Sequence, residues 1–256
     1  MRRLLRTAAL AAAAAAALTP GPGAVAQEGS PYGVNVHAPS GAVLRAQLDR
    51  VEAAGIAWVR IDFIWAVVEQ EPGRYDWRLY DELVAEAERR GLAILAILAY
   101  TPAWATDGPE LSGVPRDVGA WTRFCAAAAT RYRDTIRAWE LWNEPNLDRF
   151  WDGTREEYWE RILIPGADAI HAAAPDALVA GPALAHLQSG DWHHWLLETL
   201  ERAGDRLDVV THHAYDRDGY GDLTDKLTGS TPFADDPPLW DVVAPSVREV
   251  LKEAGV

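Results

Sequence analysis

The segment from Trp139 to Asn146, with the sequence WELWNEPN, carries the side chains best suited to chemistry. It places a carboxylic acid, Glu144, directly after an amide, Asn143, where an apolar run typical of a buried strand ends. A carboxyl group there suits acid/base chemistry on a sugar, which normally uses two carboxylates. The Asn143 amide can both donate and accept, so it suits a sugar hydroxyl. The segment therefore raises the question of where a second carboxylate lies.

Short apolar runs alternate with longer stretches of helical periodicity along most of the chain. The runs begin near residues 32, 56, 92, 137, 177 and 207, which predicts six successive βα units with parallel strands. Polar and aromatic residues gather where these runs end: His37, Asp62, Trp65, Tyr100, Glu144, His213 and Tyr215.

These strand ends distinguish between two α/β architectures. A (β/α)8 barrel brings all of its strand ends to one face, whereas an open doubly wound sheet spreads them along a crevice. The sequence also lacks the glycine-rich phosphate loops that open nucleotide-binding sheets use. We therefore predict an α/β fold, a (β/α)8 TIM barrel of which about six βα units are present.

We expect a capping box at Thr154 and Glu157, and a kink or break of the following helix at Pro165-Gly166.

The first 26 residues predict a secretory signal peptide. Three arginines precede the apolar run from Ala8 to Leu18, and the small-residue site Ala24-Val25-Ala26 follows it. This run of 11 residues is shorter than the ~20 that a bilayer requires. We expect cleavage near Ala26, secretion to an extracellular or periplasmic location, and no membrane association afterwards. Residues 27–256 contain no linker-like stretch, which predicts one domain.

The composition excludes some classes of partner. A net charge of -14 argues against nucleic acid, because phosphate binding depends on Lys and Arg. The single cysteine, Cys125, excludes an internal disulfide, and its helical apolar pattern predicts a small buried thiol. The chain has 12 tryptophans, which are expected mainly in the core, although flat indole faces also fit sugar rings.

Taken together, these motifs resemble the retaining glycoside hydrolases of clan A, which are (β/α)8 barrels. The matching stretches are GVNVH on strand one, WVRIDFIW on strand two, YTPAW on strand three, WELWNEPN on strand four and DVVTHHAY on strand six. Their order and spacing are most similar to family 39, the β-xylosidase and α-iduronidase group, with the family 5 cellulases as the nearest competitor. The resemblance covers essentially residues 31–256. It implies hydrolysis of O-glycosidic bonds in an oligosaccharide or polysaccharide, with a carbohydrate as partner and no cofactor.

The resemblance also implies roles for individual residues. Glu144 matches the general acid/base, and Asn143 matches the residue that binds the 2-hydroxyl of the reacting sugar. His213 and Tyr215 match an H-x-Y motif whose tyrosine hydrogen-bonds the nucleophile. Arg60 matches an arginine near that nucleophile.

Several of these positions have alternatives. Arg60 is equally compatible with a structural ion pair to the inward-facing Glu140. His37 and Trp65 match positions that line the cleft. The adjacent His212 and His213 point to opposite faces of a strand, so we expect no metal site.

The second carboxylate is harder to assign. Glu140 shares a strand face with Glu144, but four extended residues at ~3.3 Å each place it about 13 Å away. Asp208 begins strand six and so lies at the wrong end. Asp62 is the only internal candidate, for an inverting pair about 6.5–9.5 Å apart. The resembled family takes its nucleophile from the end of strand seven, expected beyond residue 256. Three readings follow: a truncated retaining glycosidase, a barrel that binds glycans without cleaving them, or an inverting enzyme that uses Asp62.

Overall fold

The fold is built on one parallel sheet of six strands, in the order β1-β2-β3-β4-β5-β6. A computed structural model of the chain describes residues 30–37, 40–185, 191–213 and 247–256. The strands are β1 (Gly33–Asn35), β2 (Trp58–Ile64), β3 (Ala93–Ala99), β4 (Ala138–Leu141), β5 (Leu178–Leu184) and β6 (Val209–His212). Each strand pairs in parallel with the next one along the chain.

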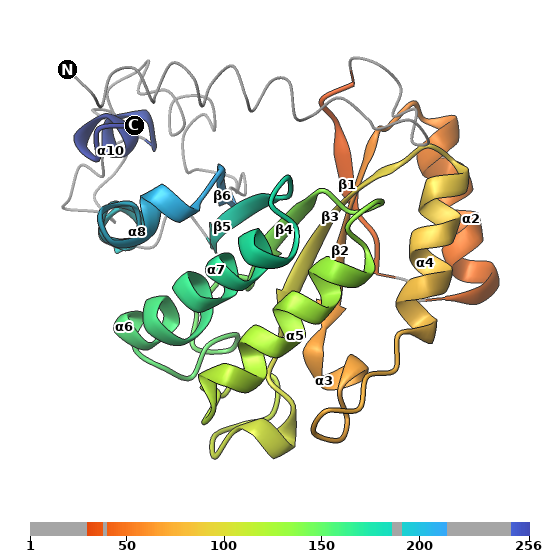
Figure 1. Ribbon diagram of the computed structural model, residues 1–256. Coiled ribbons are helices and arrows are strands. Elements are labelled where there is room, and N and C mark those ends of the chain that lie inside the picture. The colour runs from red at the N-terminus through yellow and green to blue at the C-terminus, as the bar shows by residue number, and fades with distance from the viewer. Residues whose placement is uncertain (1–29, 38–39, 186–190, 214–246) are drawn as a thin grey trace.

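Helices connect the strands and cover the outside of the sheet (Figure 1). They are α2 (Gly41–Ala53), α3 (Trp65–Val68), α4 (Arg78–Arg89), α5 (Val118–Arg131), α6 (Arg155–Tyr158), α7 (Ile164–Ala173), α8 (Trp192–Ala203) and α10 (Val247–Glu253). Short 3-10 turns span Ala103–Ala105 and Gly204–Arg206. Because the strand order never reverses, the sheet is wound in one direction, as in a barrel and unlike a doubly wound sheet. The predicted partial (β/α)8 barrel is therefore confirmed.

The alternation along β2 explains which residues reach the two faces of the sheet. Val59, Ile61 and Phe63 are buried toward the helices. Arg60 and Asp62 take the intervening positions, and their charged groups enter the barrel interior. The hydrophobic core thus lies between sheet and helices, and the polar residues line the inside.

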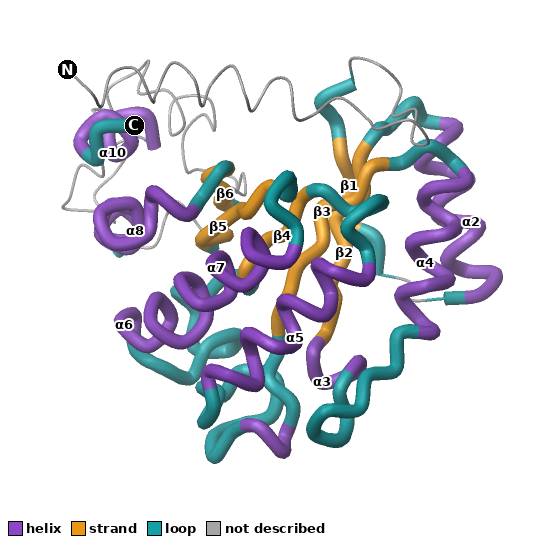
Figure 2. Tube along the Cα trace, in the orientation of Figure 1, coloured by secondary structure: helices purple, strands orange, loops and turns teal. Residues whose placement is uncertain are grey.

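The helical segment after β4 is irregular but unbroken (Figure 2). The Thr154 side chain caps the Glu157 amide and Glu157 caps Thr154 in return, which confirms the capping box. A π-helical stretch over Trp159–Leu163 then leads into α7, and Pro165 occupies its first turn. The helix continues past Pro165 because the π-helical stretch directly before it already departs from the α-helical bonding that a proline interrupts. Gly166 allows α7 to approach β4 closely, since a Cβ there would lie 2.9 Å from Leu141 Cδ2.

Two other expectations concern isolated features. Cys125 is a free and buried thiol, as expected, and burial raises its pKa well above the ordinary value. The proposed signal peptide and its cleavage site lie outside the described residues and stay predictions. Among the described helices, none is both long and apolar enough to span a bilayer.

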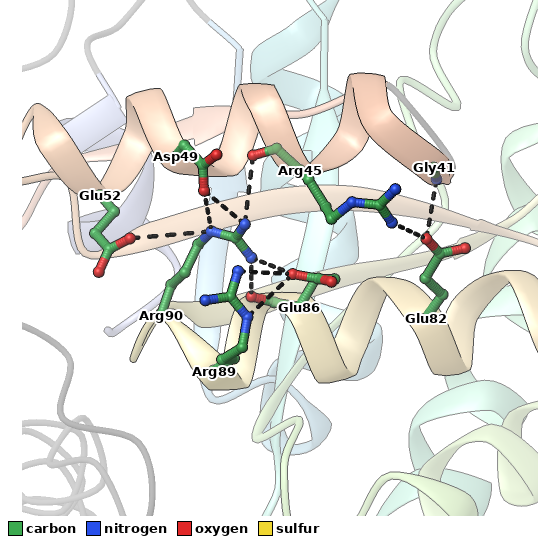
Figure 3. A network of polar contacts seen from close by, with 8 residues as sticks. All are labelled: Gly41, Arg45, Asp49, Glu52, Glu82, Glu86, Arg89 and Arg90. Atoms are coloured by element: carbon green, nitrogen blue, oxygen red, sulfur yellow. Dashed lines mark hydrogen bonds and ion pairs between the residues drawn. The ribbon is translucent and has the colours of Figure 1, made fainter.

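A group of charged side chains joins α2 to α4 (Figure 3). Arg90, directly after α4, is buried to 1% side-chain exposure and donates to Asp49 Oδ1 from Nε at 2.9 Å and from Nη2 at 2.6 Å. Its Nη1 donates to the Glu86 carbonyl at 2.7 Å. Arg45 adds an exposed pair with Glu82 at 2.9 Å. Arg90 therefore links α2 and α4. Because its side chain is buried, these contacts replace most of the water around the guanidinium.

Replacing Arg90 with methionine is expected to lower the free energy of unfolding by about 2 kcal/mol. The change keeps an apolar stem but removes several hydrogen bonds to charged groups. Arg89→Met is the matched control, because Arg89 is 62% exposed and pairs with the same Glu86; it is expected to change stability by less than about 0.5 kcal/mol. Urea denaturation followed by circular dichroism measures both. Equal losses in the two variants would contradict the role given to Arg90.

Candidate active site

Glu144 lies in a strained turn directly beyond β4. The strand ends at Leu141, and the chain turns through positive φ angles at Trp142 (72°) and Glu144 (49°). The Trp142 amide donates to the Leu98 carbonyl at 2.9 Å, and the Glu144 amide donates to the Ala183 carbonyl at 3.0 Å. Such angles are uncommon for residues other than glycine and persist only where neighbours hold them. Strands β3 and β5 therefore fix the backbone of this turn from both sides.

This turn corrects the expected geometry between the two glutamates. The predicted separation assumed an extended strand from Glu140 to Glu144, whereas the strand stops at Leu141. The two carboxylates are kept apart instead because each has its own partners. Glu140 is engaged by Arg60 inside the barrel, and Glu144 is engaged by other residues.

The two oxygens of the buried Glu144 carboxylate have different partners. His213 Nδ1 lies 2.7 Å from Oε1, and the His213 amide donates to the Leu184 carbonyl at 2.7 Å. An ionised carboxylate only accepts, so Nδ1 donates this hydrogen bond when Glu144 is ionised. Arg149 Nη2 lies 3.3 Å from Oε2, and its side chain is 67% exposed. One oxygen is thus held closely by the residue directly after β6, and the other is contacted from the mouth of the barrel.

Arg60 connects the interior of the barrel to Asn143. Its Nε donates to Glu140 Oε2 at 2.7 Å, and its Nη2 donates to Asn143 Oδ1 at 3.0 Å. Glu140 has a side-chain exposure of 1%, so the predicted structural pair is present. Because arginine has only donors, it orients the Asn143 oxygen toward itself and leaves the amide nitrogen for other partners. Arg60 therefore serves the ion pair and the orientation of Asn143 together.

Asp62, Tyr100 and the exposed His37 extend this polar group. Burial raises the pKa of Asp62, and the charges of Arg60 and His37 partly oppose that shift. Burial also raises the pKa of the Tyr100 hydroxyl, and the nearby Asp62 charge adds to the effect. Tyr100 interacts with Asn143 as well, and its backbone has a φ of 74°. The sequence placed Tyr100 at a strand end but did not assign it to the site; its position before Thr101-Pro102, where β3 must end, was the available signal.

The remaining predicted site residues have different outcomes. Trp65 is fully buried, packs between Trp104 and Phe124, and donates to Glu69 Oε2 at 2.6 Å. Its assignment to the cleft is therefore wrong, because neither face of the ring is open to a ligand. Tyr215 lies outside the described residues.

Asp208, the acid that precedes β6, is committed to structural contacts. Asp208 accepts from the Val179 amide at 2.9 Å and lies 3.2 Å from His171 Nε2, at the start of β6 as expected. Burial lowers the pKa of His212, and the neighbouring His213 adds to this effect. Within the described ranges, no group of three or more His, Cys, Asp or Glu side chains is arranged to hold a metal ion.

Comparisons with known proteins agree with this architecture. The family model described as "Glycosyl hydrolases family 39" matches residues 113–253. A β-xylosidase of Geobacillus stearothermophilus is 30% identical over 112 residues, covering 40% of this chain and 21% of the relative. A β-galactosidase of Thermus thermophilus is 34% identical over 97 residues, covering 34% of this chain and 15% of the relative.

A solved structure extends the likeness to most of the chain. The monomeric β-xylosidase from Caulobacter crescentus CB15 superposes with a TM-score of 0.61 at 26% identity, covering 77% of this chain and 44% of that one. A family 39 enzyme from Xanthomonas axonopodis pv. citri, at 23% identity and a TM-score of 0.60, supports the fold. The matches thus span about a fifth of the first relative and less than half of these solved chains.

Removing Arg60 is expected to destabilise the protein strongly. Arg60→Met leaves the buried Glu140 carboxylate without its partner, at a cost of about 3 kcal/mol. The double variant Arg60→Met with Glu140→Met is expected to recover most of that loss, because replacing a whole buried pair is often nearly neutral. A double-mutant cycle in urea measures the coupling. Losses that simply add would show that the two side chains act independently.

Replacing Asp62 with asparagine is expected to raise the free energy of unfolding at pH 7. The folded-state pKa of Asp62 lies above the ordinary 3.8, so the ionised carboxylate lowers stability at neutral pH. That cost is fully present above the folded pKa and fades as the pH falls toward and below 3.8, where both states bind the proton. Urea unfolding from pH 7 to pH 3.5 measures the difference. The exposed Asp134→Asn is the control, and an Asp62→Asn advantage that does not shrink with falling pH contradicts this account.

Proposed function

The chain belongs to family 39 of the glycosyl hydrolases, and from that premise we propose that it hydrolyses O-glycosidic bonds by a retaining double displacement. Glu144 is the general acid/base in this proposal. The chain spans only part of the relatives that it matches, so the activity is inferred from the site and the family together.

The arrangement around Glu144 carries the proposal. A single buried carboxylate, beyond the carboxyl end of β4, has one oxygen held by His213 at 2.7 Å. The neighbouring Asn143 is oriented by Arg60 so that its amide nitrogen can donate to a sugar hydroxyl. A positioned acid beside a hydroxyl-binding amide is what the first step of glycoside cleavage requires.

The reaction then has two balanced steps. In the first, Glu144 gives its proton to the glycosidic oxygen while the bond from that oxygen to the anomeric carbon breaks. The leaving group takes the bonding electrons, and a second carboxylate forms an ester with the anomeric carbon. In the second, ionised Glu144 takes a proton from water, whose oxygen attacks the anomeric carbon and releases the second carboxylate. The resemblance described above assigns that nucleophile to a seventh strand.

The relatives suggest which glycosides to test first. Two of them are named β-xylosidase and one is named β-galactosidase. We therefore include β-linked pentosides and hexosides in the proposed substrate class. Simple β-D-xylosides are the first probes because both the sequence and the structural comparisons lead to enzymes of that name.

Glu144→Gln is expected to reduce kcat/KM for xylobiose by about 10²- to 10⁴-fold, because the leaving sugar then departs without its proton. The loss is expected to be smaller for 4-nitrophenyl β-D-xylopyranoside, whose leaving group needs little protonation. Glu156→Gln, at an exposed position in the first turn of α6, is the matched control and is expected to retain activity.

Three results separate the proposal from its alternatives. Equal losses on the two substrates contradict the acid role of Glu144. Calorimetric binding of xylobiose without turnover contradicts hydrolysis by this chain and supports the glycan-binding alternative. Inverted stereochemistry of the product by NMR, together with loss of turnover in Asp62→Asn, supports the inverting alternative.

A further inference from the structure

The two contacts of the Glu144 carboxylate differ in strength. The His213 contact is short and largely buried, whereas Arg149 approaches at 3.3 Å from an exposed position. An exposed ion pair of that length contributes little to stability, since water and salt screen it. The Arg149 guanidinium can therefore exchange Glu144 for another anion at little cost.

Phe150, the residue next to Arg149, is anchored to the site. The Phe150 carbonyl accepts from Trp142 Nε1 at 2.9 Å, and the Phe150 amide donates to the Leu147 carbonyl at 2.9 Å. The Arg149 guanidinium lies 4.5 Å from the centre of the Phe150 ring. The contact with this anchored ring favours a position of the guanidinium beside Glu144.

Its location relates Arg149 to the leaving group. When His213 Nδ1 donates to Oε1, Oε2 is the oxygen of Glu144 that is left to carry the proton for the glycosidic oxygen. Arg149 contacts this same Oε2. A group bonded to the glycosidic oxygen therefore comes within reach of the guanidinium, whereas the sugar that reacts at its anomeric carbon is held by Asn143.

We propose that Arg149 makes the leaving-group side of this site selective for an aglycone that carries a carboxylate, such as a uronic acid residue. This inference rests on the proposed function. The planar guanidinium matches a carboxylate in two parallel hydrogen bonds, a geometry that an ammonium group cannot offer. In a chain with a net charge of -14, the exposed arginine supplies positive charge at the place where an anionic ligand must approach.

The exchange of Glu144 for the aglycone carboxylate as the partner of Arg149 also prepares Glu144 to act as the acid. When the aglycone carboxylate takes the Arg149 guanidinium, Glu144 Oε2 loses its cationic neighbour and can hold the proton for the leaving oxygen. Binding of an acidic leaving group and preparation of the acid are thus linked through one side chain.

The experiment compares two non-hydrolysable ligands that differ only in charge. They are 4-carboxyphenyl and 4-carbamoylphenyl 1-thio-β-D-xylopyranoside, titrated into the full chain by calorimetry at pH 7 and low salt. The carboxylate ligand is expected to bind about tenfold more tightly, as for a hydrogen bond to a charged group. Arg149→Gln is expected to abolish this ratio and Arg149→Lys to restore part of it.

Arg123→Gln is the matched control. Arg123 is 66% exposed and pairs with Asp117 at 3.2 Å on α5, so the variant changes the same charge at a similar exposure away from Glu144. It is expected to keep the tenfold ratio. Circular dichroism confirms that each variant is folded.

The outcomes distinguish this inference from the proposed function. If the carbamoyl ligand binds but the carboxylate ligand binds no more tightly, the inference fails and the proposed function stands. A preference that persists in Arg149→Gln, or that also disappears in Arg123→Gln, overturns the inference too. If the wild-type chain binds neither ligand, both the xyloside proposal and the inference are overturned.

Discussion

The candidate site depends on the guanidinium of Arg60, which joins two strands that are not neighbours. Arg60 lies on β2, Glu140 lies on β4, and β3 pairs with both strands between them. In a flat sheet, strands two positions apart are ~9.5 Å from each other, so a long side chain is needed to cross the middle strand. The pair forms inside the barrel, where water is scarce and a lone charge would be costly. Once formed, it fixes how β2 and β4 lie relative to each other.

The strained turn at Glu144 follows from this framework. Arg60 orients Asn143 from below, while carbonyls of β3 and β5 hold the amides of Trp142 and Glu144. Each of these contacts restricts a backbone that would otherwise relax from its positive φ angles. The same turn removes Glu144 from the strand ladder and directs its carboxylate toward His213. Rigid neighbours on both sides thus keep an acid in a conformation that an isolated chain would not adopt.

The sequence predicted the features that depend on periodicity and position along the strands. Apolar runs and helical periods located the starts of the six strands to within two residues, and strand ends located Glu144 and Asn143. The pairing of Arg60 with Glu140 was one of two alternatives, because a buried charge needs a partner. Trp65 was misassigned because its burial depends on α3 beginning directly at the end of β2, which packs the ring beneath Phe124. The role of Tyr100 depends on a φ angle that tertiary contacts impose, and the local sequence signalled only that β3 must end before Thr101-Pro102.

Exposure divides the polar contacts of the site into two kinds. Inside the barrel, the Arg60 contacts are shielded from solvent, so added salt weakens them little. At the mouth, Arg149 meets Glu144 where ions and water compete for both groups. A substitution in the interior therefore changes the position of Glu144 together with the residues that the Arg60 contacts hold in place. A substitution at the mouth changes which molecules the acid meets and leaves the framework intact. Because these two effects are separable, the contact at Arg149 can change while the arrangement of Arg60, Asn143 and Glu144 is kept.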